Sequence, residues 1–181
     1  TLTVDPGSPY EGRDFSVRGT LNLNGVSVGR VDAREGPGAV VNASDTVFTS
    51  NERFGFSFTN AEGNITRSTI VNEDANGVGL ALAGNLGVSS APLSRVQISD
   101  SSVSAGDAGG QVAAGGTVIA RATSFSGGTG IRMIAGSFEL TEGSRAIGSD
   151  TGLRLDYSTA GQPSYARSEE RRVGKECRSR W

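Results

Sequence analysis

Gly130-Ile131-Arg132-Met133 places one polar residue between two apolar residues directly after a glycine. The same pattern occurs in Gly55-Phe56-Ser57-Phe58, Gly79-Leu80-Ala81-Leu82 and Gly152-Leu153-Arg154-Leu155, with a looser copy in Gly109-Gly110-Gln111-Val112. The first glycines stand at positions 55, 79, 109, 130 and 152, so they are 24, 30, 21 and 22 residues apart. A repeat of this length in a chain with strand-like alternation is typical of a β-solenoid, in which each repeat forms one coil.

Two further short runs follow each copy of the pattern. The second run alternates apolar and polar residues, as in Val96-Gln97-Ile98 and Phe138-Glu139-Leu140. The third combines Ser or Thr with an apolar residue, as in Ser68-Thr69-Ile70 and Thr123-Ser124-Phe125. Three strand-like segments per repeat predict the coil of a parallel β-helix, an all-β fold. A sandwich or closed barrel suits this repeated triplet less well.

Alternation along a strand places every second side chain inside the coil. We expect an interior formed by Phe56, Phe58, Ile65, Leu80, Leu82, Val96, Ile98, Val118, Ile131, Met133, Phe138, Leu140, Leu153 and Leu155. The side chains expected to point outward are Ser57, Gln97, Arg132, Glu139 and Arg154. Arg132 and Arg154 should lie on adjacent coils, about 4.8 Å apart along the axis. Two positive charges this close need an acidic neighbour or a ligand, unless the two side chains point away from each other into solvent. Glu139 is the nearest acidic candidate in the sequence.

The sequence divides into four parts. Residues 1–15 are expected to be an irregular segment that leads into the solenoid, because Asp5-Pro6-Gly7-Ser8-Pro9 is rich in turn residues. Residues 16–156 are predicted to form the β-helix, with Gly38 as a further pattern glycine and a long loop at Gly84–Pro92. Residues 157–166 are expected to be a trailing loop. The frequent Gly-x-Gly sequences, such as those that include Gly79 and Gly130, are expected at turns with positive φ.

Residues 167–181 differ from the rest of the chain. They contain six basic and three acidic residues, together with the only Lys, Cys and Trp of the sequence. All fifteen positions resemble the in-frame translation of a common sequencing adapter. We therefore interpret this run as a non-native tail and exclude it from the function. We also expect the natural chain to continue past Ala166 and the solenoid to have uncapped ends.

The composition of residues 1–166 argues against several kinds of chemistry. With 11 basic and 16 acidic residues the net charge is −5, and no His, Lys, Cys or Trp remains. The absence of His excludes Ser–His–Asp catalysis and argues against a zinc site. The charges are dispersed and form no basic patch, which predicts no nucleic-acid binding. We expect no cofactor and no metal.

Three acidic pairs are the remaining candidates for catalysis: Asp32/Glu35, Glu73/Asp74 and Glu139/Glu142. Two carboxyl groups can hydrolyse glycosidic bonds. We interpret these pairs as solvated turn residues, so no catalytic, cofactor-binding or metal-binding residue is assigned and the protein is not expected to be an enzyme.

The region Val96–Ile147 resembles the passenger of a pertactin-like autotransporter. The resemblance rests on Val-Gln-Ile-Ser-Asp-Ser-Ser-Val-Ser from residue 96, Gly-Gly-Gln-Val-Ala-Ala-Gly-Gly-Thr-Val-Ile-Ala from residue 109, and Gly-Thr-Gly-Ile-Arg-Met-Ile-Ala-Gly-Ser-Phe-Glu-Leu-Thr from residue 128. More loosely, it covers most of residues 16–156. It implies a right-handed parallel β-helix at the surface of a Gram-negative bacterium, anchored by an outer-membrane β-barrel that follows in the native chain.

This resemblance implies a non-catalytic virulence role in adhesion, in aggregation or as a stalk. The partners would be a host surface protein or glycan, or other copies of the chain through the solenoid edges. The loop Gly84–Pro92 and the turn Asn72–Gly77 are the expected contact points, because loops on rigid scaffolds carry recognition. The alternative is a β-helical polysaccharide-active enzyme or a phage tailspike fragment, which predicts carboxylates on adjacent coils of one face.

Overall fold

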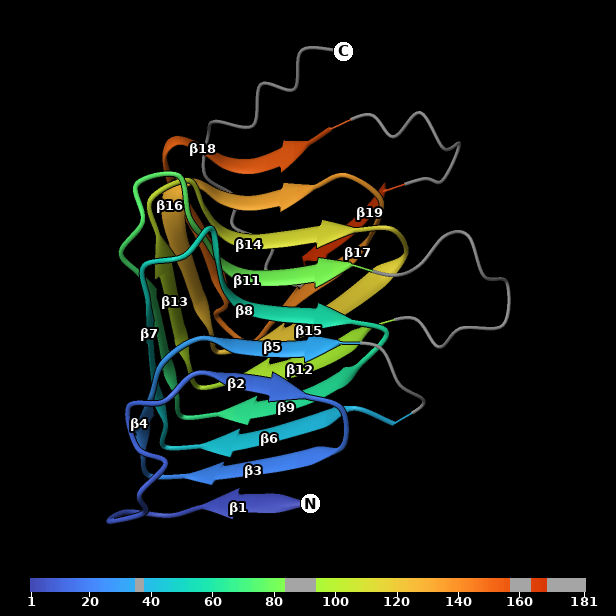
Figure 1. Cartoon of the computed structure of the whole chain (residues 1–181). Helices are drawn as coiled ribbons and strands as arrows, with labels where there is room; N and C mark the ends of the chain where they lie inside the picture. Colours follow the sequence, from blue (N-terminus) through green and yellow to red (C-terminus); the bar gives the residue numbers. More distant parts are fainter. Residues whose placement is uncertain (35–37, 84–93, 157–163, 169–181) are drawn as a thin grey trace.

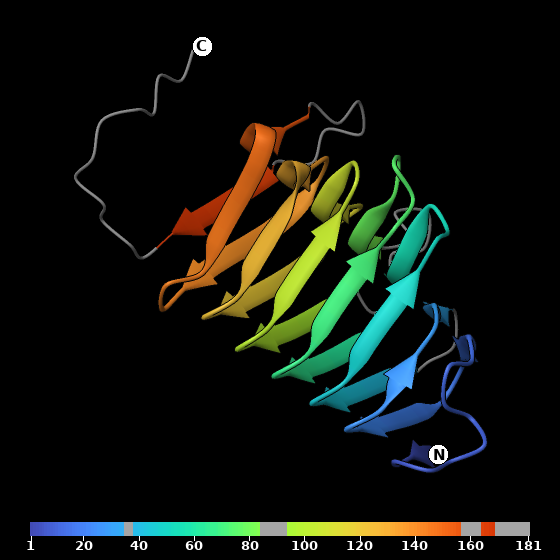
Figure 2. The ribbon, with the colours of Figure 1, turned by 90° about the vertical axis from the view of Figure 1, so that its left-hand side faces the viewer.

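A computed structural model describes residues 1–34, 38–83, 94–156 and 164–168, which form a right-handed parallel β-solenoid of about six turns (Figure 1). The chain passes repeatedly through three flat flanks, here called faces 1, 2 and 3. Figure 2 shows the coils following one another in sequence order from the N-terminal to the C-terminal end. The described residues contain no helix, so none that could cross a membrane.

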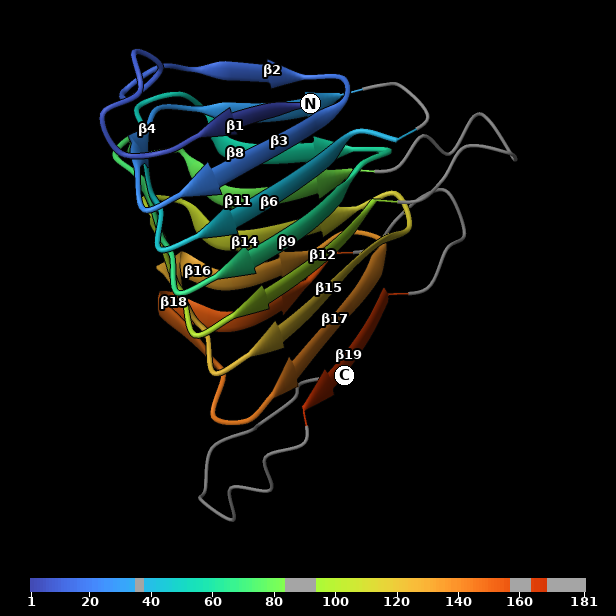
Figure 3. The same cartoon turned by 90° about the horizontal axis from the view of Figure 1, so that it is seen from below.

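Each face is a stack of parallel strands from successive coils. Face 1 contains β2 (Phe15–Val17), β5 (Val31–Arg34), β8 (Phe54–Thr59), β11 (Val78–Ala83) and β14 (Ala108–Ala113). Face 2, seen in Figure 3, contains β1 (Leu2–Val4), β3 (Thr20–Asn24), β6 (Val40–Ser44), β9 (Glu62–Thr66), β12 (Arg95–Ser99), β15 (Gly116–Arg121), β17 (Gly136–Thr141) and β19 (Ser164–Ser168). Face 3 contains β4 (Ser27–Val28), β7 (Val47–Ser50), β10 (Thr69–Asn72) and β13 (Ser102–Ala105).

Two long strands, β16 (Ser124–Met133) and β18 (Arg145–Leu155), belong to two faces. Their N-terminal parts continue face 3 and their C-terminal parts continue face 1. Because these strands run round the corner, faces 1 and 3 together form one 11-stranded sheet, whereas face 2 is an 8-stranded sheet.

The repeated glycine pattern marks face 1. Leu80 pairs with Phe56 on one side and Gly110 on the other, and Ile131 pairs with Gly110 and Leu153, so the five copies are in register. The prediction that Gly38 is a further pattern glycine was wrong. Val31 pairs with Phe56 and supplies the face-1 strand of that coil, while the residues after Gly38 form β6 on face 2.

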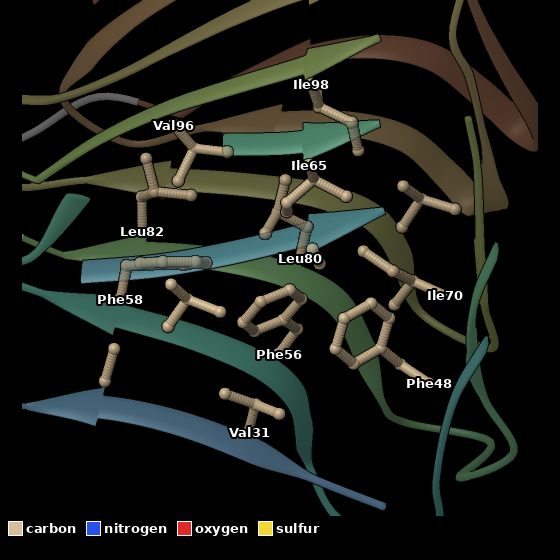
Figure 4. Packing of buried hydrophobic residues seen from close by; sticks show 14 of the residues in the cluster. Val31, Phe48, Phe56, Phe58, Ile65, Ile70, Leu80, Leu82, Val96 and Ile98 are labelled. Carbon is tan, nitrogen blue, oxygen red and sulfur yellow. The ribbon is translucent and has the colours of Figure 1, made fainter. Parts of the chain in front are cut away.

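The core is a continuous column of apolar side chains between the three faces (Figure 4). Phe48 of face 3 stacks on Phe56 of face 1 with ring centroids 4.6 Å apart, and the ring centroids of Phe56 and Phe58 are 4.7 Å apart. Eleven predicted interior residues are buried: Phe56, Phe58, Ile65, Leu80, Leu82, Val96, Ile98, Val118, Ile131, Met133 and Phe138.

The prediction fails at the C-terminal end of the core. Leu140 is only partly buried, and Leu153 and Leu155 are 44% and 58% exposed. Leu153 and Leu155 do lie in the interior columns, since Leu153 pairs with Ile131 and Leu155 with Met133. They are exposed because β18 is the last described strand of face 1, so no further described strand of that face packs against it.

The corner between faces 2 and 3 repeats one backbone geometry. Asp45, Arg67 and Asp100 have φ values of 52°, 44° and 50°, and the residue that follows each is a buried Thr or Ser. The Ser68 hydroxyl donates to the carbonyl of Thr66 at 2.7 Å and accepts from the backbone N–H of Thr46 in the previous coil at 3.2 Å. Buried polar groups are thus satisfied by the neighbouring coil.

The corner between faces 3 and 1 requires glycine for a different reason than expected. Neither Gly79 nor Gly130 has a positive φ. Instead, a Cβ atom on Gly79 would lie 2.6 Å from a methyl group of Val103, and one on Gly130 would lie 2.6 Å from the backbone nitrogen of Ile147. The expectation of positive φ was therefore wrong, and close packing of the backbone excludes a side chain.

Both expected flanking segments contain strands. Within residues 1–15, β1 pairs with β3 because Leu2 and Val4 stack on Leu21 and Leu23. At the other end, β19 pairs with β17, so residues 164–166 of the expected trailing loop and residues 167–168 of the expected tail continue face 2. Residues 169–181 and the predicted loop Gly84–Pro92 lie outside the described residues.

Candidate functional site

The outward side of face 1 carries the most varied column of side chains. One residue from each strand stands at the same level, as the register shows. In coil order this column is Ser16, Asp32, Ser57, Ala81, Gln111, Arg132 and Arg154. Its charged residues lie towards the two ends, with uncharged residues between them, and two neighbouring hollows lie along it.

The N-terminal hollow is formed by an arginine cluster, which we define as Arg18, Arg30 and Arg34 around Asp32. Asp32 is buried, with 5% of its surface exposed. Its carboxylate accepts hydrogen bonds from Arg30 Nη2 at 3.2 Å and from Ser57 Oγ at 2.7 Å, and it forms an ion pair with Arg34 Nε.

The environment of Asp32 keeps it ionised. Burial alone would raise the pKa of this carboxyl group. The hydrogen bonds from Arg34 and Ser57, the positive charge of Arg34 and the hydrogen bond from Arg30 outweigh burial, so the pKa lies below its ordinary value of 3.8. Asp32 therefore acts as a fixed anion that orients Arg30 and Arg34.

Arg18 adds a third positive charge. Val17 pairs with Ala33, which brings Arg18, the next residue, level with Arg34 on the adjacent coil. Arg18 is exposed and has no ion pair within the described residues. Among the described residues, the hollow is thus lined by three cations and one anion. The sequence prediction of dispersed charge missed this cluster, although the alternation of Arg30, Asp32 and Arg34 on one strand was a signal for it.

The middle hollow lies over β8, β11 and β14 and shares Arg34 with the arginine cluster. Small outward side chains, including Ser57, Ala81 and Ala113, form its floor. Phe54 stands at its side and packs on a small apolar cluster of Val78, Ala81 and Ala108. A flat, partly apolar floor next to a cationic hollow can contact both the body and the charged group of one extended ligand.

The C-terminal end of the column is an ion-pair network. Arg132 and Arg154 are paired in register, as predicted. Arg132 donates two hydrogen bonds to Asp107, at 2.8 and 3.0 Å, and Arg154 donates to Asp156 at 2.6 Å. The prediction that Glu139 is the acidic neighbour of these arginines was wrong, because Glu139 pairs with Ile119 on face 2. Two arginines and two aspartates balance each other here.

Face 2 instead carries a ladder of side-chain amides. Asn42 Nδ2 donates to Asn22 Oδ1 at 2.9 Å, and Asn64 Nδ2 donates to Asn42 Oδ1 at 3.0 Å. These outward groups bond to one another along the axis and so stabilise the stacking of coils. Face 1 is therefore the stronger candidate for ligand contact.

The predicted acidic pairs do not form a common site in the described residues. Asp32 is held by arginines, while Glu35 lies outside the described residues. Glu73 and Asp74 belong to the turn after β10, and Glu142 forms an ion pair with Arg121. Across residues 1–34, 38–83 and 94–156, no group of three or more His, Cys, Asp or Glu residues that could hold a metal ion is found.

The predicted contact turn Asn72–Gly77 has a structural side and an exposed side. Asn72 is buried, and its Nδ2 donates to the carbonyls of Glu52 at 2.7 Å and Val78 at 2.9 Å. Ala75 and Asn76 are exposed at the tip. The turn is thus anchored from within and presents only a short surface.

Comparisons with protein-family models, with curated proteins and with solved structures found no match. The function is therefore inferred from the fold and the geometry of face 1.

Proposed function

We propose that this chain is a segment of a pertactin-like autotransporter passenger, displayed at the surface of a Gram-negative cell and anchored there through an outer-membrane β-barrel. Its role is non-catalytic binding in adhesion or aggregation, on a stalk made of stacked coils. The right-handed parallel solenoid supports this proposal, as do the sequence motifs that resemble passengers of this family.

One observation carries the non-catalytic part of the proposal. The prominent carboxylates of face 1, Asp32 and Asp107, are each engaged by arginine side chains. A glycoside hydrolase needs a general acid with a raised pKa beside a second carboxylate. The pKa of Asp32 is lowered instead. Face 1 is thus suited to holding a ligand.

Surface display tests the proposal. The full chain is placed between a secretion signal and an outer-membrane β-barrel translocator in a Gram-negative host, with the translocator alone as the matched control. We expect added protease to cleave the chain on intact cells, and displaying cells to adhere to host-cell layers or to settle faster than control cells. A chain that stays inside the cell, or displaying cells that behave like the control, would contradict the proposal.

A separate assay addresses the enzymatic alternative. Purified chain is incubated with neutral and acidic polysaccharides, and new reducing ends or unsaturated products are measured. We expect none above a protein-free blank. A steady release of products that is lost in Asp32→Asn or Asp107→Asn would instead favour a polysaccharide hydrolase or lyase.

A further inference from the structure

The arginine cluster has hydrogen-bond donors that its own aspartate does not use. A guanidinium group carries five N–H donors in a planar fork that matches carboxylate and sulfate oxygens. Arg30 directs one nitrogen, Nη2, to Asp32. Arg18 has no hydrogen bond or ion pair within the described residues and lines the same hollow. Donors remain for an external anion.

The register fixes the spacing of these donors. Arg18 directly follows Val17, the last residue of β2, and Arg34 directly follows Ala33, the residue of the adjacent strand β5 that pairs with Val17. Neighbouring strands lie about 4.8 Å apart. Two guanidinium groups at this spacing can hold one anionic group between them. Asp32 limits their motion by binding Arg30 and Arg34, which lowers the entropic cost of ligand binding.

The ligand must extend beyond a single anion. Arg34 lines both the arginine cluster and the middle hollow, so the two form one continuous surface along the axis. The floor beyond Arg34 offers Ser57, Ala81 and Gln111 at one level, with Phe54 at the side. Hydroxyl-bearing rings with apolar faces suit a floor that is partly polar and partly apolar.

We propose that face 1 binds a linear acidic polysaccharide. A sulfate or carboxylate group of the polymer lies between Arg18, Arg30 and Arg34, and the rings of neighbouring sugar units lie over Ser57, Ala81 and Gln111. The whole chain has a net charge of −2, so general attraction of polyanions does not account for such binding. The proposal does not depend on surface display, and the two can fail separately.

Heparin serves as the probe, in about 0.15 M salt where charges are screened over about 8 Å. The background is the full chain with Arg171, Arg172, Lys175, Arg178 and Arg180 replaced by Gln, because these tail residues could bind heparin themselves. Arg18→Gln is compared with the matched control Arg145→Gln, which removes one exposed arginine from face 3. Binding is measured by calorimetry, and circular dichroism checks folding.

We expect Arg18→Gln to weaken heparin binding about tenfold, since a hydrogen bond to a charged group contributes about that factor. Arg18→Lys should recover part of the loss, and Arg145→Gln should have no effect. Gln111→Ala should weaken heparin binding but leave inorganic sulfate binding unchanged. Neutral dextran should not bind.

Three results would overturn the proposal. The first is no heparin binding, or equal losses in Arg18→Gln and Arg145→Gln. The second is heparin binding that is insensitive to Gln111→Ala, which would restrict the site to small anions. The third is duplex DNA binding as tightly as heparin with the same dependence on Arg18, which would indicate a general polyanion surface.

Discussion

Gly109 lies directly against Gly130 of the next coil. A Cβ atom on Gly109 would stand 2.9 Å from the carbonyl oxygen of Gly130 and 2.6 Å from the backbone nitrogen of Ser126. Both contacts are to backbone atoms, which cannot turn aside as a flexible side chain can. At Gly109, as at Gly79 and Gly130, the distance between coils therefore leaves no room for a side chain.

Gly109→Ala should destabilise the solenoid. Forcing a methyl group into this corner requires a backbone shift, which costs about 1–3 kcal/mol. For a protein of this size, that corresponds to a decrease in Tm of roughly 2–12 °C. Gly19→Ala is the control, because a Cβ atom there would meet nothing within 4 Å. Equal Tm values for the two variants, measured by calorimetry, would show that the corner can accommodate a methyl group without a backbone shift.

Ser68→Ala tests the buried hydroxyls at the corner between faces 2 and 3. The substitution leaves the N–H of Thr46 without the acceptor that it has at 3.2 Å. An unsatisfied buried donor costs about 1–3 kcal/mol. The free energy of unfolding from urea titration should therefore fall by about that amount. Ser27→Ala removes an exposed hydroxyl from face 3 and should change it little. A similar small effect in both variants would contradict the role given to Ser68.

The sequence predicted the coil well and its corners poorly. The alternation in Phe56-Ser57-Phe58 and Leu80-Ala81-Leu82 is enough to predict which of these side chains point into the core. A shift of the strand register by one residue would turn all the apolar side chains to the solvent, so only one register buries them. The corners depend on contacts between residues of different coils, which are about 20 or more positions apart in the chain. Such contacts cannot be predicted from the pattern of a single sequence. The close approach at Gly109 and the bond from Thr46 to Ser68 are of this kind. Likewise, Gly38 resembled a pattern glycine because the true face-1 strand, Val31–Arg34, follows an arginine.

Asp32 should make the stability depend on pH. Its folded-state pKa lies below the ordinary value of 3.8, so the unfolded state binds a proton more readily than the folded state. The stabilisation by Asp32 is fully present well above pH 3.8 and is lost as the pH falls through the folded-state pKa.

Asp32→Asn measures this contribution. At pH 7 the variant should have a lower Tm than the wild type, because the positive charges of Arg30 and Arg34 lose their anion. The difference should shrink as the pH falls below 3.8. Glu11→Gln removes an exposed carboxyl group and serves as the control. A Tm difference that stays constant between pH 7 and pH 3 would show that Asp32 acts by shape rather than by charge.

The site was harder to predict than the core, for a physical reason. Core positions follow from polarity alone, whereas the arginine cluster needs Arg18 to be level with Arg34, and this follows only from the pairing of β2 with β5. The segment before β3 looked irregular because of its turn residues, so its coil was not aligned with the others. Arg132 and Arg154 show the converse: the repeat predicted their pairing, but their partners Asp107 and Asp156 come from strand ends that the pattern does not mark.

The exposed edge of β18 is expected to mediate self-association. Leu153 and Leu155 lie in interior columns yet are exposed, and β18 is the last strand of face 1 in the part of the chain that the structure describes. Strand edges with apolar side chains pair with other chains. Replacing both leucines with Asn should therefore shift the sedimentation profile towards monomer. Val47→Asn is the matched control, because Val47 is 41% exposed but lies in β7, which is paired on both sides. If the control shifts the profile as much as the double variant does, association depends on general surface hydrophobicity and the edge has no special role.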